Sequence, residues 1–184
     1  MNKIKFLKHC FKSIRTTGTI ARSSKNLCIK MVGEIDFSTS MNIVELGAGD
    51  GVLTSYILKN MHPNARLLSF EINEEFCNIM RATIQDERLT IIQDSAEHID
   101  NYLKKYKMYQ ADAILSALPF VVLPKDLTKN ILQTSYNSLK SEGVFVQMHY
   151  SLALKKMYKR IFKSVTTKFV PINLPPAYVM RMTK

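Results

Sequence analysis

The sequence has few of the residues that break regular structure or cross-link a chain. Its 184 residues include only 6 Gly and 6 Pro, and this length suits one domain with a substantial core. The 3 cysteines are far apart and form no Cys-x-x-Cys pair, which argues against a disulfide framework and a zinc site, and no other metal is expected. No apolar run is long enough to cross a bilayer, and a secretory signal is also missing.

Acidic residues are absent from both ends of the chain. Residues 1–33 and residues 143–184 each carry eight Lys or Arg and no Asp or Glu. All 15 acids therefore lie in the middle, so that a mildly acidic body has two basic ends and the net charge is +11. If the ends meet in space, they form a basic face for anionic lipid or nucleic acid. Two separate solvated surfaces are the alternative, and charge alone does not decide between them.

Hydrophobic patterning predicts strands and helices in alternation. Strands are expected at 42–46, 65–71, 89–93, 111–116, 144–150, 164–170 and 177–182. Helices are expected from Ser23 or Ser24 to Val32 and at 52–60, 74–84, 98–105, 126–139 and 152–162, with a turn at 141–143. This order predicts an α/β fold in which helices cover both faces of a mostly parallel sheet. The last two strands have no helix between them, which indicates a hairpin and one antiparallel strand near the sheet edge.

A glycine cluster, Gly47-Ala48-Gly49-Asp50-Gly51, follows the first expected strand and its Glu45. In an open α/β sheet, ligands bind beyond the carboxyl ends of the strands. A dinucleotide fingerprint would need glycine at Val52, and Asp50 would repel a pyrophosphate. The loop therefore suits a ligand that has a cationic amino group and no phosphate.

Acidic residues also end the second and third expected strands. Glu71 can accept hydrogen bonds from ribose hydroxyls, and Asp94 can accept one from an adenine amino group. Together with the glycine loop, these acceptors match S-adenosylmethionine. The predicted cofactor-binding residues are Glu45, Gly47, Ala48, Gly49, Gly51, Glu71, Ile72, Asp94, Ser95 and Ser116.

The fourth expected strand ends in Ser116-Ala117-Leu118-Pro119-Phe120, where class I methyltransferases hold the methyl acceptor. Enzymes acting on nucleic-acid amines usually have Asn or Asp followed by Pro-Pro-Tyr, or Asn-Leu-Pro-Tyr, at this place. With Ser116 in the first position, the orienting amide is missing. This segment with Pro124 resembles the bacterial phospholipid N-methyltransferases, as do residues 18–24, 146–150 and 173–177. Arg22, Ala117 and His149 depart from the Pro, Gly and aromatic residue that are common in that family.

The resemblance covers nearly the whole chain and implies a Rossmann-like class I methyltransferase with a seven-stranded sheet. It implies a single domain, residues 1–184, that methylates phosphatidylethanolamine towards phosphatidylcholine with S-adenosylmethionine as cofactor. Ser116 and Leu118 would orient the acceptor nitrogen, and Tyr150 would line the headgroup pocket, so these three are the predicted catalytic residues. Further candidates for the headgroup and its phosphate are His149, Lys155, Lys156, Arg160 and Arg181.

Residues 2–15 predict an amphipathic helix, and residues 1–17 form the predicted basic N-terminal element. Such a helix either lies in an anionic membrane surface or packs its apolar side on its own domain. The resemblance implies the first, which gives a cytoplasmic protein peripherally bound to the inner face of the membrane, with no obligate protein partner evident. The predicted membrane-binding residues are Lys5, Phe6, Lys8, Phe11, Lys12 and Arg15.

Two other functions stay open at this point. A nucleic-acid methyltransferase resembling the rRNA adenine dimethylases fits the basic charge, but Ser116 and the absence of a C-terminal RNA-binding domain oppose it. A catalytically silent membrane-binding module on the same fold is opposed by the intact acceptors Glu71 and Asp94.

Overall fold

A seven-stranded sheet forms the centre of the computed structural model, which describes residues 24–184. The strand order is β3-β2-β1-β4-β5-β7-β6. Only β7 runs antiparallel to its neighbours, β5 and β6, and it lies one strand in from the edge. The predicted fold class is therefore confirmed. The strands are β1 (Asn42–Leu46), β2 (Arg66–Phe70), β3 (Leu89–Ile92), β4 (Ala111–Ser116), β5 (Leu139–His149), β6 (Ser164–Val170) and β7 (Ala177–Thr183).

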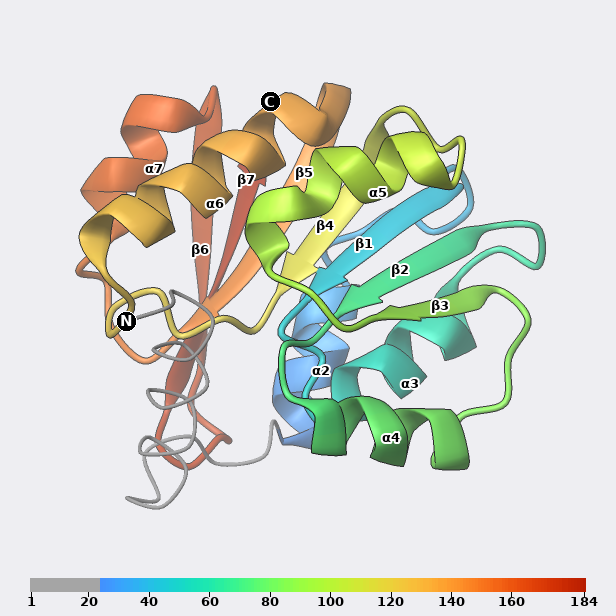
Figure 1. The fold of residues 1–184 in the computed structure, drawn as a ribbon. Helices are drawn as coiled ribbons and strands as arrows, with labels where there is room; N and C mark the ends of the chain where they lie inside the picture. Colours follow the sequence, from blue (N-terminus) through green and yellow to red (C-terminus); the bar gives the residue numbers. More distant parts are fainter. Residues whose placement is uncertain (1–23) are drawn as a thin grey trace.

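Helices cover both faces of the sheet (Figure 1). One face carries α2 (Lys25–Val32), α3 (Val52–Asn60) and α4 (Glu74–Thr83). The other carries α5 (Ile99–Lys105), α6 (Lys125–Ser138) and α7 (Lys155–Ile161), and a short 3₁₀ turn, η1 (Ala96–His98), precedes α5. Each face has its own buried apolar cluster, so the strands are covered on both sides and read as apolar runs.

The structure departs from the predicted boundaries mainly around β5. The predicted turn at 141–143 lies inside this strand, which begins at Leu139. Leu139 pairs with Ala111 and Val144 with Ala113, so the strand carries extra residues at this point, and Glu142 adopts φ 60°. Burial of the Leu139 side chain explains why the strand starts early. The predicted N-terminal helix and residues 18–23 lie outside the described part of the chain.

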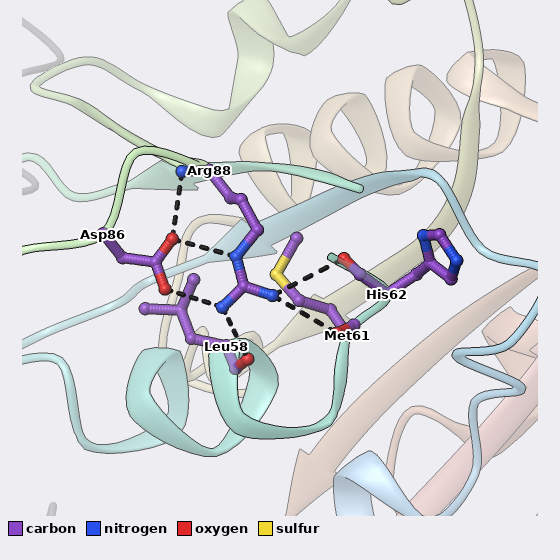
Figure 2. A network of polar contacts seen from close by, with 5 residues as sticks. All are labelled: Leu58, Met61, His62, Asp86 and Arg88. Atoms are coloured by element: carbon purple, nitrogen blue, oxygen red, sulfur yellow. Dashed lines mark hydrogen bonds and ion pairs between the residues drawn. The ribbon is translucent and has the colours of Figure 1, made fainter. Parts of the chain in front are cut away.

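Arg88 fixes the C-terminal end of α3 at the amino edge of the sheet (Figure 2). Its guanidinium donates to the carbonyls of Leu58 (3.0 Å) and Met61 (3.3 Å), and it is paired with Asp86 at 2.6 Å. Carbonyls at the end of a helix lack partners within the helix and favour a cation. Arg88 thus ties α3 to the start of β3, and its hydrogen bonds lower the pKa of Asp86.

The carboxyl ends of the parallel strands meet at the opposite edge. Strand order reverses between β1 and β4, and this is where open α/β sheets bind their ligands. None of the helices described for residues 24–184 combines the length and the apolar character that a transmembrane span requires.

Candidate active site

A small hollow lies at the carboxyl edge beside the reversal of strand order. Six residues predicted for the site line it: Gly47, Glu71, Ile72, Asp94, Ser95 and Leu118. Sequence reasoning missed four apolar lining residues, which are Phe70, Ala96, Leu123 and Ile131. The tips of β1 to β4 thus converge on one space, as the positions of the acids predicted.

The glycine loop is held by hydrogen bonds from its own backbone. Gly47 and Ala48 both donate to the Phe70 carbonyl, at 2.9 and 3.1 Å. A Cβ on Gly47 would stand 2.9 Å from the Leu118 side chain, so this glycine is required by protein packing. Gly49 differs, because it has φ 58° and, apart from its chain neighbours, no atom of residues 24–184 lies within 4 Å of an added Cβ. The open space over Gly49 is the cradle that a close ligand requires.

Glu71 ties the end of β2 to this loop. Its carboxylate accepts from the Gly49 N–H and from the Asn73 N–H, both at 2.8 Å, and the residue is only 6% exposed. These two bonds hold the carboxylate at the end of β2, where the residue lines the hollow. The position of Glu71 in the hollow therefore fits the predicted role.

Glu45 is buried behind the glycine loop and is not among the lining residues. One oxygen accepts from Thr54 (2.7 Å) and Ser69 (2.6 Å), while Oε1 is buried without a hydrogen-bond partner among residues 24–184. Burial raises the pKa of Glu45 to about 7, although both hydroxyls lower it and Glu71 raises it further. A cationic amino group in the hollow would favour the ionised form of Glu45 across the glycine loop, without touching it.

Asp94 is oriented by three neighbours. It accepts from the Ser95 N–H (2.7 Å) and the Tyr102 hydroxyl (3.0 Å), and it lies 3.1 Å from His98 Nδ1. The Tyr102 ring packs edge-on against Phe70, with centroids 5.4 Å apart. Sequence reasoning missed Tyr102, because no spacing rule links it to Asp94.

Ser116 and Leu118 come together at the end of β4, but only Leu118 lines the hollow. Ser116 is fully buried, and its hydroxyl accepts from the Leu118 N–H at 3.3 Å. The Leu118 carbonyl already accepts from the Phe120 N–H (2.9 Å) and from Gln147 Nε2 (3.0 Å). Because a carbonyl has two lone pairs, the Leu118 carbonyl has no capacity left for a substrate amine.

Gln147, at the end of β5, is the residue that sequence reasoning missed on the acceptor side. Its Nε2 also donates to the Met148 carbonyl at 2.6 Å, so the presence of two acceptors fixes the orientation of the amide. Its Oε1 is buried and has no partner among residues 24–184. A glutamine within the apolar run Val144–Met148 is the signal that would have found it.

The other candidates on the acceptor side are more scattered. Tyr150 packs against the cluster on the α2 and α3 face, whereas Leu118 belongs to the cluster on the opposite face. The Tyr150 hydroxyl lies near Asn173 without a bond of ordinary geometry, and burial raises its pKa. His149 is buried against the Tyr158 hydroxyl (2.7 Å), and burial lowers its pKa to about 4, so it is neutral near pH 7.

Arg181 lies within the sheet, where it pairs with Val146 in the register of β5 and β7. Its Nε donates to the Glu34 carbonyl.

Of the remaining predicted cofactor residues, Ala48, Gly49 and Gly51 are not among the residues that line the hollow. Ala48 is nearly buried, and Gly51 precedes α3 with φ 86°. A Cβ on Gly51 would stand 2.6 Å from the Ile84 side chain, so this glycine also serves protein packing.

The topology, together with sequence similarity to known methyltransferases, defines a class I methyltransferase whose methyl donor is S-adenosylmethionine. The sequence model of the ribosomal RNA adenine dimethylase family matches residues 22–169, and the chain belongs to that family.

Individual relatives differ in how much of the chain they share. An ornithine lipid N-methyltransferase of Singulisphaera acidiphila is 29% identical over 174 residues, covering 94% of this chain and 91% of the relative. Ribosomal RNA small subunit methyltransferase A of Mycoplasma mycoides subsp. mycoides is 27% identical over 126 residues, which are 67% of this chain and 45% of the relative. The chain therefore spans less than half of that rRNA enzyme.

Solved structures share the fold at low sequence identity. A precorrin-6y C5,15-methyltransferase of Geobacter metallireducens has a TM-score of 0.70 at 15% identity, over 88% of this chain and 90% of that one. A methyltransferase of Streptococcus mutans, solved with S-adenosylhomocysteine, has a TM-score of 0.65 at 16% identity, over 90% of this chain and 100% of that one.

Proposed function

We propose that this protein transfers methyl groups from S-adenosylmethionine to the amine of a lipid headgroup at an anionic membrane surface. Phosphatidylethanolamine is the first acceptor to consider, and methylation leads towards phosphatidylcholine. Ornithine lipid offers the same chemistry, because it also presents an amine on a membrane lipid.

The observation that carries this proposal is that the segment at the end of β4 offers no group suited to holding a nucleobase. Enzymes that methylate a nucleobase stack it on aromatic side chains and hydrogen-bond its edge. Phe120 is the aromatic residue of this segment, but it is 2% exposed and packs in the core under α6. Ser116 is buried and engaged with Leu118, so the segment presents neither an amide nor an open ring to a base. A small aliphatic amine needs neither of them.

The extent of the similarity supports the same substrate class. The lipid N-methyltransferase of Singulisphaera matches along nearly the full length of both chains, whereas the rRNA relatives extend well beyond the matched part. Membership in the rRNA adenine dimethylase family keeps an RNA adenine as the second candidate acceptor.

On the cofactor side, the residues of this chain would bind S-adenosylmethionine and orient it. When bound, S-adenosylmethionine supplies a methyl group already activated on a sulfonium. Glu71 would hold the ribose hydroxyls and Asp94 the adenine amino group, while Gly49 lets the ligand approach the backbone. Glu45 would act on the amino group electrostatically from behind the loop.

On the acceptor side, the protein has to keep the amine neutral and aim its lone pair. An alkylamine has a pKa of about 10, and transfer out of water lowers it. Leu118, Leu123 and Ile131 supply an apolar wall. Gln147 does not line the hollow, but its amide contacts the Leu118 carbonyl, and its buried Oε1 has no partner among residues 24–184. A hydrogen bond to this oxygen from the amine would fix the nitrogen. We assign Gln147 this role in place of the predicted Leu118 carbonyl, whose lone pairs are both in use. Ser116 orients the turn, and Tyr150 stays a predicted headgroup residue.

Substrate class is tested by incubating the full chain with labelled S-adenosylmethionine and one of three acceptors. The first is vesicles of phosphatidylethanolamine with phosphatidylglycerol. The second is vesicles in which ornithine lipid replaces the phosphatidylethanolamine, and the third is ribosomal RNA at matched salt. We expect label in lipid. Label in RNA alone would move the protein to the second candidate, and cofactor binding without any transfer would leave only a silent module.

The role of Gln147 is tested by Gln147→Met, which keeps the length of the side chain and removes the amide. We expect kcat for lipid methylation to fall by about 10-fold or more, with unchanged affinity for S-adenosylmethionine, because one hydrogen bond to the reacting amine is lost. Gln133→Met, on the exposed side of α6, is the matched control. Equal losses of kcat and cofactor affinity would point to a structural effect and contradict the assignment.

The N-terminal residues Lys5, Phe6, Lys8, Phe11, Lys12 and Arg15 belong to the same proposal, as a membrane-binding helix on the inner face of the membrane. Neutralising Lys5, Lys8 and Lys12 should lower vesicle binding, since each lysine near an anionic surface contributes about 1 kcal/mol. Cofactor affinity should stay unchanged in this variant. Undiminished vesicle binding would leave the segment as a packing element only.

A further inference from the structure

Large apolar side chains are exposed on three loops at the carboxyl edge of the sheet. We call this set the apolar rim: Val121, Val122, Leu152, Ile172 and Leu174. Ile172 is 73% and Leu174 is 85% exposed, which is high for aliphatic side chains. An isolated exposed leucine needs no explanation, but a group gathered at one edge does.

Sheet topology brings these loops together. β4 and β5 are parallel, and β6 is parallel to β5 because both pair with the antiparallel β7. The connections that follow β4, β5 and β6 therefore leave the same edge, which is also the edge of the hollow (Figure 1). Within one connection Leu118 and Leu123 line the hollow, whereas Val121 and Val122 face solvent. The part of the apolar rim that follows β4, Val121 and Val122, is thus continuous with the acceptor side of the site.

Lysines border the rim in positions that do not serve their own helices. Lys155 and Lys156 occupy the first turn of α7, which contains no acid, and Lys25 occupies the first turn of α2. Cations are unfavourable at the N-terminal end of a helix because of the macrodipole. Lys125 begins α6 next to Asp126, the one acid of that turn. A negative surface outside the protein would give these lysines their counter-charge.

The first described residues of the chain lie beside this rim. Ser24 Oγ and Asn26 Nδ2 both donate to the Ile172 carbonyl, at 3.5 and 3.4 Å. The start of α2 and its Lys25 therefore lie at the β6–β7 loop, next to the exposed aliphatic side chains of that loop.

We propose that the apolar rim docks into an anionic lipid bilayer, with its aliphatic side chains among the acyl chains and the bordering lysines at the headgroups. This combination suits an interface, because lysines stay in the headgroup layer while apolar side chains enter below it. RNA would match the lysines, but single-stranded RNA is held by stacking on aromatic side chains, and the five rim residues are all aliphatic. The exposed aromatic at the end of β6, Phe169, already has its ring against Tyr178, with centroids 5.1 Å apart. Docking in this way opens the acceptor side of the hollow towards lipid headgroups. The inference rests on the proposed function only for this last consequence.

Tryptophan fluorescence can show what covers the rim. The chain contains no tryptophan, so a single introduced one reports on its own surroundings. In the full chain, Ile172→Trp reports on the rim and Tyr109→Trp, on the exposed connection between α5 and β4, is the control. Vesicles of phosphatidylethanolamine with phosphatidylglycerol should shift the Ile172→Trp emission to shorter wavelength, and lipids brominated on their acyl chains should quench it. The control should show neither change. Emission already at short wavelength without vesicles, and unchanged by them, would place another part of the chain over the rim and overturn the proposal.

Vesicle co-sedimentation measures the contribution of the rim to binding. The double variant Ile172→Ser with Leu174→Ser should bind these vesicles roughly 10- to 100-fold more weakly, because two large aliphatic side chains no longer enter the acyl layer. Tyr109→Ser is the matched control and should bind as the parent chain does. Unchanged binding of the double variant would contradict docking through the rim.

Methylation of dispersed short-chain lipid separates this inference from the proposed function. If the rim docks, the double variant should methylate lipid monomers at the normal rate and vesicle lipid more slowly. If the parent chain binds vesicles through the rim but methylates neither form of lipid, the proposed function fails and the docking surface stands. If the variant and the parent methylate vesicle lipid at equal rates, the docking surface is contradicted and the proposed function is unaffected.

Discussion

The two halves of the carboxyl edge, at the ends of β1 to β3 and of β4 to β6, differ in the kind of residue that they present. At the ends of β1, β2 and β3, three carboxylates, Glu71, Glu45 and Asp94, are each held by backbone N–H groups or hydroxyls of their own. Behind β4, β5 and β6, the loops carry apolar side chains into solvent and lysines border them. The first half fixes one small cationic ligand, while the second half presents a surface.

This difference explains why the functional residues of one half could be predicted from the sequence and those of the other half could not. A small polar ligand requires particular groups at strand ends, where parallel topology brings them together automatically. A membrane-facing surface requires only a sufficient apolar area and positive charge, which many arrangements supply. The first requirement leaves a local motif in the chain, and the second does not.

The largest effect is expected on the cofactor half, from Glu71→Ala. This change leaves the Gly49 and Asn73 N–H groups without their acceptor and removes the partner of the ribose hydroxyls. Hydrogen bonds to a charged group contribute about 1.5–3 kcal/mol each, so affinity for S-adenosylmethionine should fall by about 100-fold. Calorimetry measures this, and circular dichroism should show a folded domain. Glu74→Ala, an exposed acid in the first turn of α4, is the control, and an unchanged affinity of the Glu71 variant would break the site as described.

A slightly smaller effect is expected from Glu45→Gln on stability. The folded-state pKa of Glu45, about 7, lies above its ordinary value of 4.5, so the folded chain binds more protons between these pH values. Stability contributed by protonated Glu45 is therefore lost as pH rises from about 5 to 8. The variant should gain about 2–3 kcal/mol over the parent at pH 8 and little at pH 4.5.

Denaturant unfolding of both chains at the two pH values measures this difference. Contributions from other titrating groups cancel, since both chains share them. A gain of equal size at both pH values would mean that Glu45 is ionised throughout, and that the network behind the glycine loop is more polar than its burial indicates.

The fold was predictable because its strands are short apolar runs separated by clear helical periods. Boundaries failed where a contact with a distant residue decided them. Leu139 extends β5 backwards by pairing with Ala111, and no local pattern announces this. Glu142 adopts a left-handed conformation within the strand, which is the sort of residue that sequence rules assign to a turn.

The site was predictable where it depends on strand ends and unpredictable where it depends on neighbours across the sheet. Glu71 and Asp94 follow their strands directly, so topology alone places them. Gln147 is conspicuous in the sequence as a glutamine within an apolar run, but its place beside the end of β4 is known only from the register that sets it opposite Ser116. Tyr102 comes from the next helix, and its hydroxyl finds Asp94 because Phe70 supports its ring.

A smaller effect is expected from Tyr102→Phe, which removes one hydrogen bond to Asp94 and keeps the contact with Phe70. One hydrogen bond to a carboxylate that remains otherwise bonded corresponds to about 1 kcal/mol, so cofactor affinity should fall by about fivefold. Tyr109→Phe removes an exposed hydroxyl at the opposite edge and should change nothing. An affinity equal to the parent's would show that Ser95 and His98 suffice to orient Asp94.

The smallest effect is expected where the two halves are combined. Ile172 and Leu174 are exposed and share no hydrogen-bond partner with the cofactor network in the described part of the chain. Their double replacement by serine should change cofactor affinity by less than about twofold and stability by less than about 0.5 kcal/mol. Combined with Tyr102→Phe, it should give a coupling energy below about 0.5 kcal/mol, because distant sites without shared partners act additively. A larger coupling would mean that the rim and the hollow are mechanically linked, and the division of the edge into a ligand-binding half and a surface-binding half would fail.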